Sequence, residues 1–233
     1  MNKYTLHIIA LFAFVLIASC GEKKSNNKIL SYYPNGKIKE ERAYPNSKDS
    51  SWYLSYLYTP EGFLKFKATV HDSIANGPAT VYYSNGKIKE LQYYINDSLN
   101  GLFIDFDSIG RIKKYAYYKD GKLDGLSTSY FSNGNIEESC NYKDDKKQGF
   151  CVYYYRNGNI GSFSNCDMDK INGRLSIFYP TTGKLHQYLL LHEGIPIWGI
   201  EYDTNGNLKI YGKVKSHSKW SRKELVHHIL YDE

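Results

Sequence analysis

A glycine that recurs about every twenty-four residues is the feature that most constrains the fold of this 233-residue chain. The intervals between successive glycines are 26, 24, 24, 24, 24, 25 and 23 residues, so one unit occurs eight times between residues 29 and 215. Such a period indicates a single repeat domain whose units pack mainly against their neighbours. The glycines are Gly36, Gly62, Gly86, Gly110, Gly134, Gly158, Gly183 and Gly206.

Three columns of apolar residues keep a fixed distance from these glycines. An aromatic residue stands four positions before each glycine: Tyr32, Tyr58, Tyr82, Phe106, Tyr130, Tyr154, Tyr179 and Tyr202. An aliphatic residue stands two positions after it: Ile38, Leu64, Ile88, Ile112, Ile136, Ile160, Leu185 and Leu208. Eight positions after it stand Tyr44, Val70, Tyr94, Tyr118, Tyr142, Cys166, Leu191 and Val214.

The turn residues predict which kind of β-hairpin carries these columns. Pro34 and Pro60 suit the second position of a type I turn, and the repeated glycine suits a left-handed fourth position that closes a three-residue loop. In that register all three apolar columns are expected on one face, whereas a two-residue Asn-Gly turn would divide them. A second set of glycines is predicted to mark the return loops: Gly77, Gly101, Gly125, Gly149 and Gly173.

The predicted fold is all-β: an elongated, single-layer antiparallel meander of about eight tandem hairpins, with about sixteen strands. The abundance of Tyr, Phe and Gly agrees with many short strands and tight turns. Glu40, Glu90 and Glu138 would project from the apolar face, which favours an open sheet over a sandwich. Ser221 and Glu224 resemble a capping box, so residues 216–233 are expected to form a helical cap over the last strand.

The first residues are typical of an export signal. Lys3 precedes the apolar run IIALFAFVLI, which is short for a membrane span, and the run ends in IASC. That ending resembles a bacterial lipobox, which implies a signal peptide over residues 1–19 and a lipid on Cys20. An ordinary signal peptide or an uncleaved anchor is the alternative. Residues 20–28 are then a flexible tether, and residues 29–215 form a repeat domain in the cell envelope, outside the cytoplasm.

The segment KDGKLDGLSTSYFSNGNIEESCNYKDDKKQGFCVYYYRNGNI, residues 119–160, resembles two tandem MORN-type repeats of the variant class common in bacterial proteins. The similarity extends over nearly the whole chain after the signal. It implies a sheet of stacked hairpins that serves as a scaffold or protein-binding surface, without shared catalytic residues. Some bacterial proteins with such repeats are antitoxins, a role that fits poorly with an exported chain. The Gly-x-Gly and Tyr-x-Gly pairs of lipid-binding members are mostly missing.

No pattern in the sequence predicts an enzyme, a metal site or a cofactor. The adjacent His227 and His228 would point apart on a helix or a strand, which makes them a poor metal pair. The net charge of +6 is too small for a dedicated nucleic-acid binder. Cys166 falls in an apolar column, which indicates packing. Cys140 and Cys151 flank a return loop and are expected to face each other, either as a disulfide in an oxidising compartment or as two buried thiols.

Two binding roles remain, both for a membrane-anchored module. In the first, the open sheet binds an envelope protein or peptide through exposed aromatic residues three positions before the glycine: Tyr33, Tyr83, Phe131 and Tyr155. In the second, a basic stripe on the face opposite the apolar columns binds anionic glycan or lipid headgroups. The stripe consists of Lys37, Lys39, Lys65, Lys87, Lys89, Arg111 and Lys113. These cations could instead form a solvated face that deters edge-to-edge aggregation.

Overall fold

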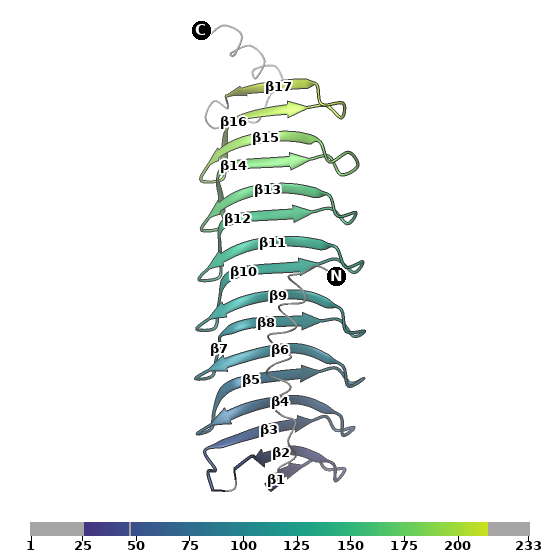
Figure 1. Ribbon diagram of the computed structural model, residues 1–233, viewed down its shortest axis with the longest axis vertical. Helices are drawn as coiled ribbons and strands as arrows, with labels where there is room; N and C mark the ends of the chain where they lie inside the picture. The colour runs from purple at the N-terminus through teal and green to yellow at the C-terminus, as the bar shows by residue number, and fades with distance from the viewer. Residues whose placement is uncertain (1–25, 47, 214–233) are drawn as a thin grey trace. The chain divides into compact units, whose positions relative to one another are not determined.

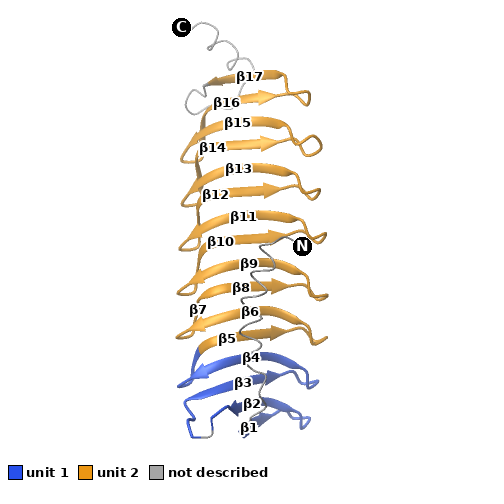
Figure 2. Cartoon of the chain, viewed as in Figure 1, with its two compact units in different colours: residues 1–75 blue, residues 76–233 orange. Residues whose placement is uncertain are grey.

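The computed structural model describes residues 26–46 and 48–213, and this part of the chain contains seventeen β-strands and no helix. The all-β prediction is confirmed. The chain divides into two compact units, residues 1–75 and 76–233 (Figure 2). The first strand begins at Asn26, so residues 26–28, which were assigned to the tether, belong to β1 instead. The predicted signal segment, Cys20 and the C-terminal cap lie outside the described residues.

Unit 1 contains a four-stranded antiparallel meander in which each strand pairs with the next. Its strands are β1 (Asn26–Tyr32), β2 (Ile38–Tyr44), β3 (Trp52–Tyr58) and β4 (Leu64–His71). The return connection between β2 and β3 is longer than in the other repeats. Tyr53, Ala68 and Val70 are its buried apolar residues on one face, and Ala43 is buried on the other.

Unit 2 is a longer antiparallel meander that forms one layer (Figure 1). Each hairpin again pairs with its neighbours in chain order, and the two-residue strand β7 interrupts the pairing of β6 with β8. The strands are β5 (Ile74–Tyr82), β6 (Ile88–Ile95), β7 (Ser98–Leu99), β8 (Gly101–Phe106), β9 (Ile112–Lys119), β10 (Lys122–Tyr130), β11 (Ile136–Lys143), β12 (Lys146–Tyr154), β13 (Ile160–Asp167), β14 (Lys170–Phe178), β15 (Leu185–His192), β16 (Ile195–Tyr202) and β17 (Leu208–Lys213).

The predicted type I turn with a left-handed glycine is confirmed at the repeated glycines. In hairpin β5–β6 the Gly86 N–H donates to the Tyr83 carbonyl over 3.0 Å, the Tyr83 N–H donates to the Lys87 carbonyl over 2.8 Å, and Gly86 has a φ of +80°. The seventh turn is one residue longer, because the Gly183 N–H donates to the carbonyl of Tyr179. Phe178 therefore pairs with Leu185 there, and Tyr179 was wrongly assigned to the first aromatic column.

The return connections differ from the prediction. They are two-residue turns in which both residues have positive φ, as at Asp144–Asp145, and this geometry defines a type I′ hairpin. The second set of glycines does not form these turns. Gly125, with a φ of +117°, lies inside β10 where the register with β9 shifts, so these glycines permit β-bulges. A Cβ at Gly125 would lie 3.1 Å from the Cβ of Tyr117.

A second irregularity follows every type I turn and changes which residues share a face. Tyr82 pairs with Ile88, but Val81 pairs with Glu90, so Lys89 is an extra residue on its strand. Paired residues share a face and successive strand residues alternate. Tyr94, eight positions after the glycine, therefore lies on the face opposite Tyr82. The expectation that all three apolar columns share one face was wrong, and the bulge is the reason.

Candidate interaction surfaces

A tyrosine three positions before the glycine connects several hairpin turns to the next. The Tyr83 hydroxyl donates to the Phe106 carbonyl over 2.7 Å, and the Tyr155 hydroxyl donates to the Phe178 carbonyl over 3.0 Å. In unit 1 the Tyr33 hydroxyl donates to the Tyr58 carbonyl over 2.8 Å. These three tyrosines are half-buried, as is Phe131, so the expectation that they are exposed was wrong. Whether they bind a partner remains a prediction.

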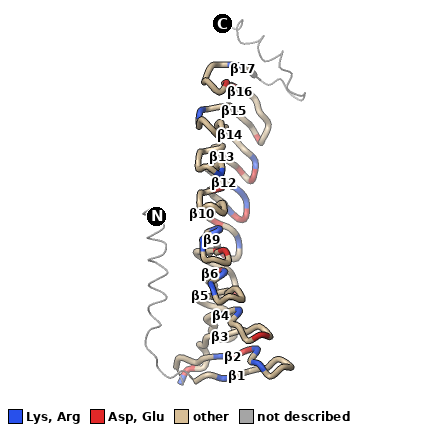
Figure 3. The backbone as a smooth tube through the Cα atoms, turned by 90° about the vertical axis from the view of Figure 1, so that its right-hand side faces the viewer, with Lys and Arg blue, Asp and Glu red and all other residues tan. Residues whose placement is uncertain are grey.

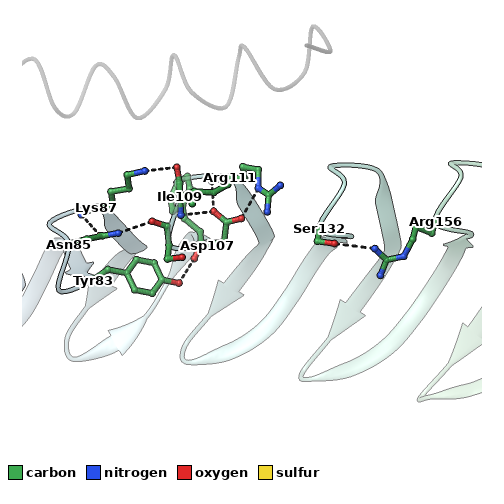
Figure 4. A network of polar contacts seen from close by, with 10 residues as sticks. Tyr83, Asn85, Lys87, Asp107, Ile109, Arg111, Ser132 and Arg156 are labelled. Atoms are coloured by element: carbon green, nitrogen blue, oxygen red, sulfur yellow. Dashed lines mark hydrogen bonds and ion pairs between the residues drawn. The ribbon is translucent and has the colours of Figure 1, made fainter.

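The asparagine before the glycine makes a second connection of the same kind. The Asn85 side chain accepts the Lys87 N–H over 3.0 Å and donates to the Ser108 carbonyl in the next turn over 2.9 Å (Figure 4). The Lys87 ammonium then donates to the Ile109 carbonyl over 2.9 Å. Turns with this pattern are therefore held to the next turn by side chains that satisfy backbone carbonyls, and these contacts give the Tyr-x-Asn-Gly-Lys pattern its structural role.

Most cations of the predicted basic stripe already have partners. Lys37 and Lys87 donate to turn carbonyls, at 2.5 and 2.9 Å respectively. Three others form ion pairs: Lys89 with Glu90 at 2.9 Å, Arg111 with Asp107 at 2.7 Å and Lys113 with Asp105 at 2.8 Å. Lys39 lies 5.9 Å from the centre of the Tyr33 ring, and Lys65 is exposed. An anion would therefore have to compete with carboxylates for much of this stripe.

One face of unit 2 carries no charge along its central row. The residues of this row pair with one another from strand to strand without interruption across β5, β6 and β8 to β17. The row consists of Thr80, Leu91, Ile104, Tyr115, Thr128, Ser139, Val152, Phe163, Ser176, Tyr188, Ile200 and Tyr211. Leu91, Ile104 and Thr128 are buried. We call this surface the apolar face.

Two further rows flank the central row on the apolar face. The row beside the type I turns contains Tyr82, Ile88, Phe106, Ile112, Tyr130, Ile136, Tyr154, Ile160, Phe178, Leu185, Tyr202 and Leu208. The row beside the return turns contains Pro78, Tyr93, Leu102, Tyr117, Leu126, Asn141, Phe150, Asn165, Arg174, Leu190 and Trp198. Lys213 on β17 pairs with Trp198 and completes this row, so Arg174 and Lys213 are the charged residues of the three rows.

Large apolar side chains of this face are accessible to solvent. Tyr93, Tyr117 and Phe150 expose 40, 39 and 59% of their surfaces. Phe150 stacks on Phe163 with ring centres 5.4 Å apart, so the side chains pack sideways within one layer. Burial raises the pKa of Tyr130, in the row beside the type I turns, to about 12. Side chains of this face are thus buried at Leu91, Ile104 and Thr128 in the central row and exposed at Tyr93, Tyr117 and Phe150 in the return-turn row.

The opposite face of unit 2, here called the charged face, carries the acidic residues. Glu138 forms an ion pair with Lys147 at 2.7 Å, and the Lys147 ammonium also donates to the Tyr153 hydroxyl over 2.5 Å. Burial opposes the charge on Lys147, but these hydrogen bonds outweigh it and raise its pKa. Glu90 and Glu138 therefore lie away from the apolar face, which removes the conflict they posed for the predicted register. Figure 3 shows acidic and basic positions interspersed along the unit.

Three cysteines form a buried cluster on the charged face. Cys140 pairs with Cys151 across β11 and β12, and the two form a disulfide. Cys166 on β13 is a buried free thiol packed in the same cluster, in agreement with the packing role expected for it. Of the two alternatives that the sequence left open for Cys140 and Cys151, the structure has the disulfide.

The described residues contain no group of three or more His, Cys, Asp or Glu side chains arranged to hold a metal ion. They also contain no helix long and apolar enough to cross a membrane. His227 and His228 lie outside the described residues.

Sequence reasoning missed the apolar face because its residues do not keep one spacing. Counted from the glycine, the first lies at an even position, two, and the next lie at odd positions, five and seven. Apolar residues five and seven positions after the glycine, such as Tyr115 and Tyr117, were the available signal.

Comparison with known proteins finds a repeat family that matches three segments of the chain. A family model described as the MORN repeat variant matches residues 26–44, 75–96 and 123–144, which correspond to the first, third and fifth hairpins. A search of curated proteins found no match. The crystal structure of a porin-like protein from Bacteroides uniformis ATCC 8492 has 10% sequence identity and a TM-score of 0.20, with 82% of this chain and 89% of that chain covered. A likeness at that level carries no argument about fold or function.

Proposed function

We propose that this protein is a non-enzymatic repeat scaffold that binds a partner protein through the apolar face of unit 2. The observation that carries the proposal is the placement of exposed Tyr93, Tyr117 and Phe150 on a face whose central row has no charge. Exposed apolar patches of more than a few hundred Å² mark interaction sites in soluble proteins. Aromatic residues also contribute a large share of binding energy at interfaces.

The binding surface is placed here rather than at Tyr33, Tyr83, Phe131 and Tyr155, because three of those four side chains use their hydroxyls to join neighbouring turns. The basic stripe is a weaker candidate for the same reason, since most of its cations are paired within the chain. Membrane anchoring through a lipid on Cys20 is part of the proposal, and it rests on the IASC sequence. It would hold the scaffold in the cell envelope.

The test uses neighbouring residues on opposite faces of one strand. Tyr93 lies on the apolar face of β6, whereas Gln92 lies on the charged face, where its amide donates to Glu90 over 2.7 Å. Tyr93→Lys and Gln92→Lys each add one positive charge. We expect affinity capture from solubilised envelope, followed by mass spectrometry, to recover a specific protein with wild type and Gln92→Lys. Recovery should fall at least tenfold with Tyr93→Lys. Equal recovery with both variants would contradict the proposal, and capture of a toxin would favour the antitoxin alternative.

A further inference from the structure

The apolar face of unit 2 lacks a second layer among the residues that the structure describes. Sheets that carry an apolar face normally bury it against another sheet or against helices, because apolar surface in water is unfavourable. Here twelve strands, β5, β6 and β8 to β17, present the face, and the described part of unit 2 contains neither a helix nor a second sheet. Tyr93, Tyr117 and Phe150 leave exposed apolar surface on this face that an occupant could bury.

The dimensions of the face indicate what size of occupant fits. Twelve strands spaced about 4.8 Å apart, with three rows spanning about 14 Å along each strand, give an area on the order of 700 Å². A typical monomer's largest apolar patch is about 300–600 Å². One side of a standard protein–protein interface buries about 800 Å². The footprint of the apolar face in unit 2 is therefore close to that of one side of a stable interface, and its exposed aromatic side chains lie along the return-turn row.

The charge pattern favours a partner with the same surface. In a two-fold symmetric interface the same patch meets itself, so a patch whose charges all have one sign cannot pair them across the interface. The central row and the row beside the type I turns contain no charged residue, and the two charged residues of the third row, Arg174 and Lys213, both lie toward its β17 end. A face of this composition can pack on its own copy without burying like charges. The charged face, with Glu90, Glu138 and Lys147, could not do so as readily.

The central row places a large side chain beside a small one at two points, an arrangement that suits sheets packed face to face. Tyr115 pairs with Thr128, and Phe163 pairs with Ser176, so a large ring lies beside a small side chain at both places. Facing layers of a sandwich, about 10 Å apart, fill their interior by placing large residues opposite small ones. A copy turned about an axis parallel to the strands would bring this row over itself in the reverse strand order.

We infer that the apolar face of unit 2 docks onto the same face of a second copy of this chain, so that two single-layer sheets form a two-layer sandwich. The inference rests on the proposed function, because it names the protein that the apolar face binds. The partner in this case is recognised by shape and by the absence of charge. Other protein partners and lipid are outcomes of the test.

The experiment uses two full-length copies with different affinity tags, expressed together and solubilised in mild detergent. Purification through one tag should recover the other copy for wild type and for Gln92→Lys. The double variant Tyr93→Lys, Tyr117→Lys, placed in both copies, should lower that recovery at least tenfold. Circular dichroism and thermal unfolding establish that the variants keep the fold. If the double variant fails to fold, Phe150→Lys, at a side chain 59% exposed, replaces it.

The outcomes separate this inference from the proposed function. Failure of wild-type copies to purify together overturns the inference, and so does equal recovery from all variants, which would indicate shared micelles or another contact surface. Another outcome is that the copies stay separate while another protein is captured by wild type and not by Tyr93→Lys. In that case the proposed function stands, and the inference that the partner is a second copy is wrong. If neither a second copy nor another protein depends on Tyr93, both fail. Binding of the wild type, but not the double variant, to protein-free neutral vesicles would instead assign the face to lipid.

Discussion

The tyrosine and asparagine of the repeated turn act mainly between repeats. The Tyr155 hydroxyl reaches the Phe178 carbonyl, and the Asn157 side chain reaches the Pro180 carbonyl over 2.7 Å. Both acceptors belong to the next hairpin. A buried or half-buried carbonyl without a hydrogen-bond donor destabilises the fold. These side chains donate hydrogen bonds that water would otherwise have to provide. This gives the recurring polar turn pattern a structural role.

The hydroxyl contacts predict opposite effects of two reciprocal substitutions. Tyr155→Phe removes one hydrogen bond and should lower the free energy of unfolding by about 1 kcal/mol. Phe131→Tyr places a hydroxyl at the repeat position that Tyr83 and Tyr155 occupy, from which they donate to a carbonyl of the next hairpin. This substitution should raise the free energy of unfolding by about 0.5–1 kcal/mol. Chemical denaturation monitored by tyrosine fluorescence gives both values.

A control for this pair lies in the same hairpin. Tyr154, next to Tyr155, lies on the apolar face and pairs with Ile160. Tyr154→Phe removes a hydroxyl of the same kind without touching the contact between turns, so it should change stability less than Tyr155→Phe. Equal losses from the two variants would show that the hydroxyl contact contributes nothing specific.

The carboxylate of Asp107 gives the fourth turn a pH-dependent contribution. The Arg111 backbone N–H donates to it over 2.9 Å, as do the Ile109 N–H and the Arg111 side chain. Together they lower the pKa of Asp107 to about 2 from an ordinary value of 3.8. Because the folded pKa is the lower one, the contribution is complete above about pH 4 and is lost as the pH falls toward about 2.

Asp107→Asn tests this contribution directly. At pH 7 the variant should unfold at a lower temperature than wild type, and the difference should shrink between pH 4 and pH 2 as the wild-type carboxylate gains its proton. Thermal unfolding followed at several pH values measures it. A difference that stays constant through this range would mean that the charge of Asp107 is unimportant to the turn.

At the scale of strands, the bulge after each type I turn determines the chemistry of both faces. It adds one residue to the second strand of every hairpin, so the residues of the apolar face fall two, five and seven positions after the glycine. Ile112, Tyr115 and Tyr117 follow this rule on β9. Without the extra residue, Lys114 would lie among them. The bulge therefore separates the charged and apolar faces of unit 2.

The disulfide between Cys140 and Cys151 connects two adjacent strands across the centre of the charged face. It closes a short loop, with a sequence separation of 11 residues, and removing it should cost about 2–3 kcal/mol. Peptide mapping under non-reducing conditions should recover Cys140 linked to Cys151. Cys166, which is 4% exposed, should react with a thiol reagent only after unfolding. Recovery of all three as thiols from oxidised protein would contradict this pairing, and Cys140→Ser measures its contribution to stability.

At the scale of the whole molecule, the fate of Cys20 determines where the scaffold works. The IASC sequence predicts that Cys20 carries a lipid and holds the chain in a membrane fraction. Metabolic labelling with a fatty acid should mark the wild type, and Cys20→Ala should lose the label and leave the membrane fraction. Cys166→Ala, which removes a buried thiol far along the chain, serves as the control. A wild-type protein that takes up no label would end the lipoprotein hypothesis.

The sequence by itself determined the repeat, its period and its turn. A glycine with positive φ at Gly86 and an aromatic residue paired with the aliphatic one are local consequences of turn geometry, and local geometry is readable from spacing. The same spacing allowed Cys140 and Cys151 to be expected opposite each other. It also predicted the antiparallel meander, because hairpins joined by short connections have few other arrangements.

The tertiary structure decided which residues share a face, and with them the candidate binding surface. One extra residue at Lys89 moves everything after it to the other side of the sheet, and nothing in its side chain marks it as the bulge. The exposure of Tyr33 and Tyr83 was misjudged for a related reason. Their hydroxyls find acceptors about one repeat away, and a contact between repeats depends on how the strands pair rather than on local sequence.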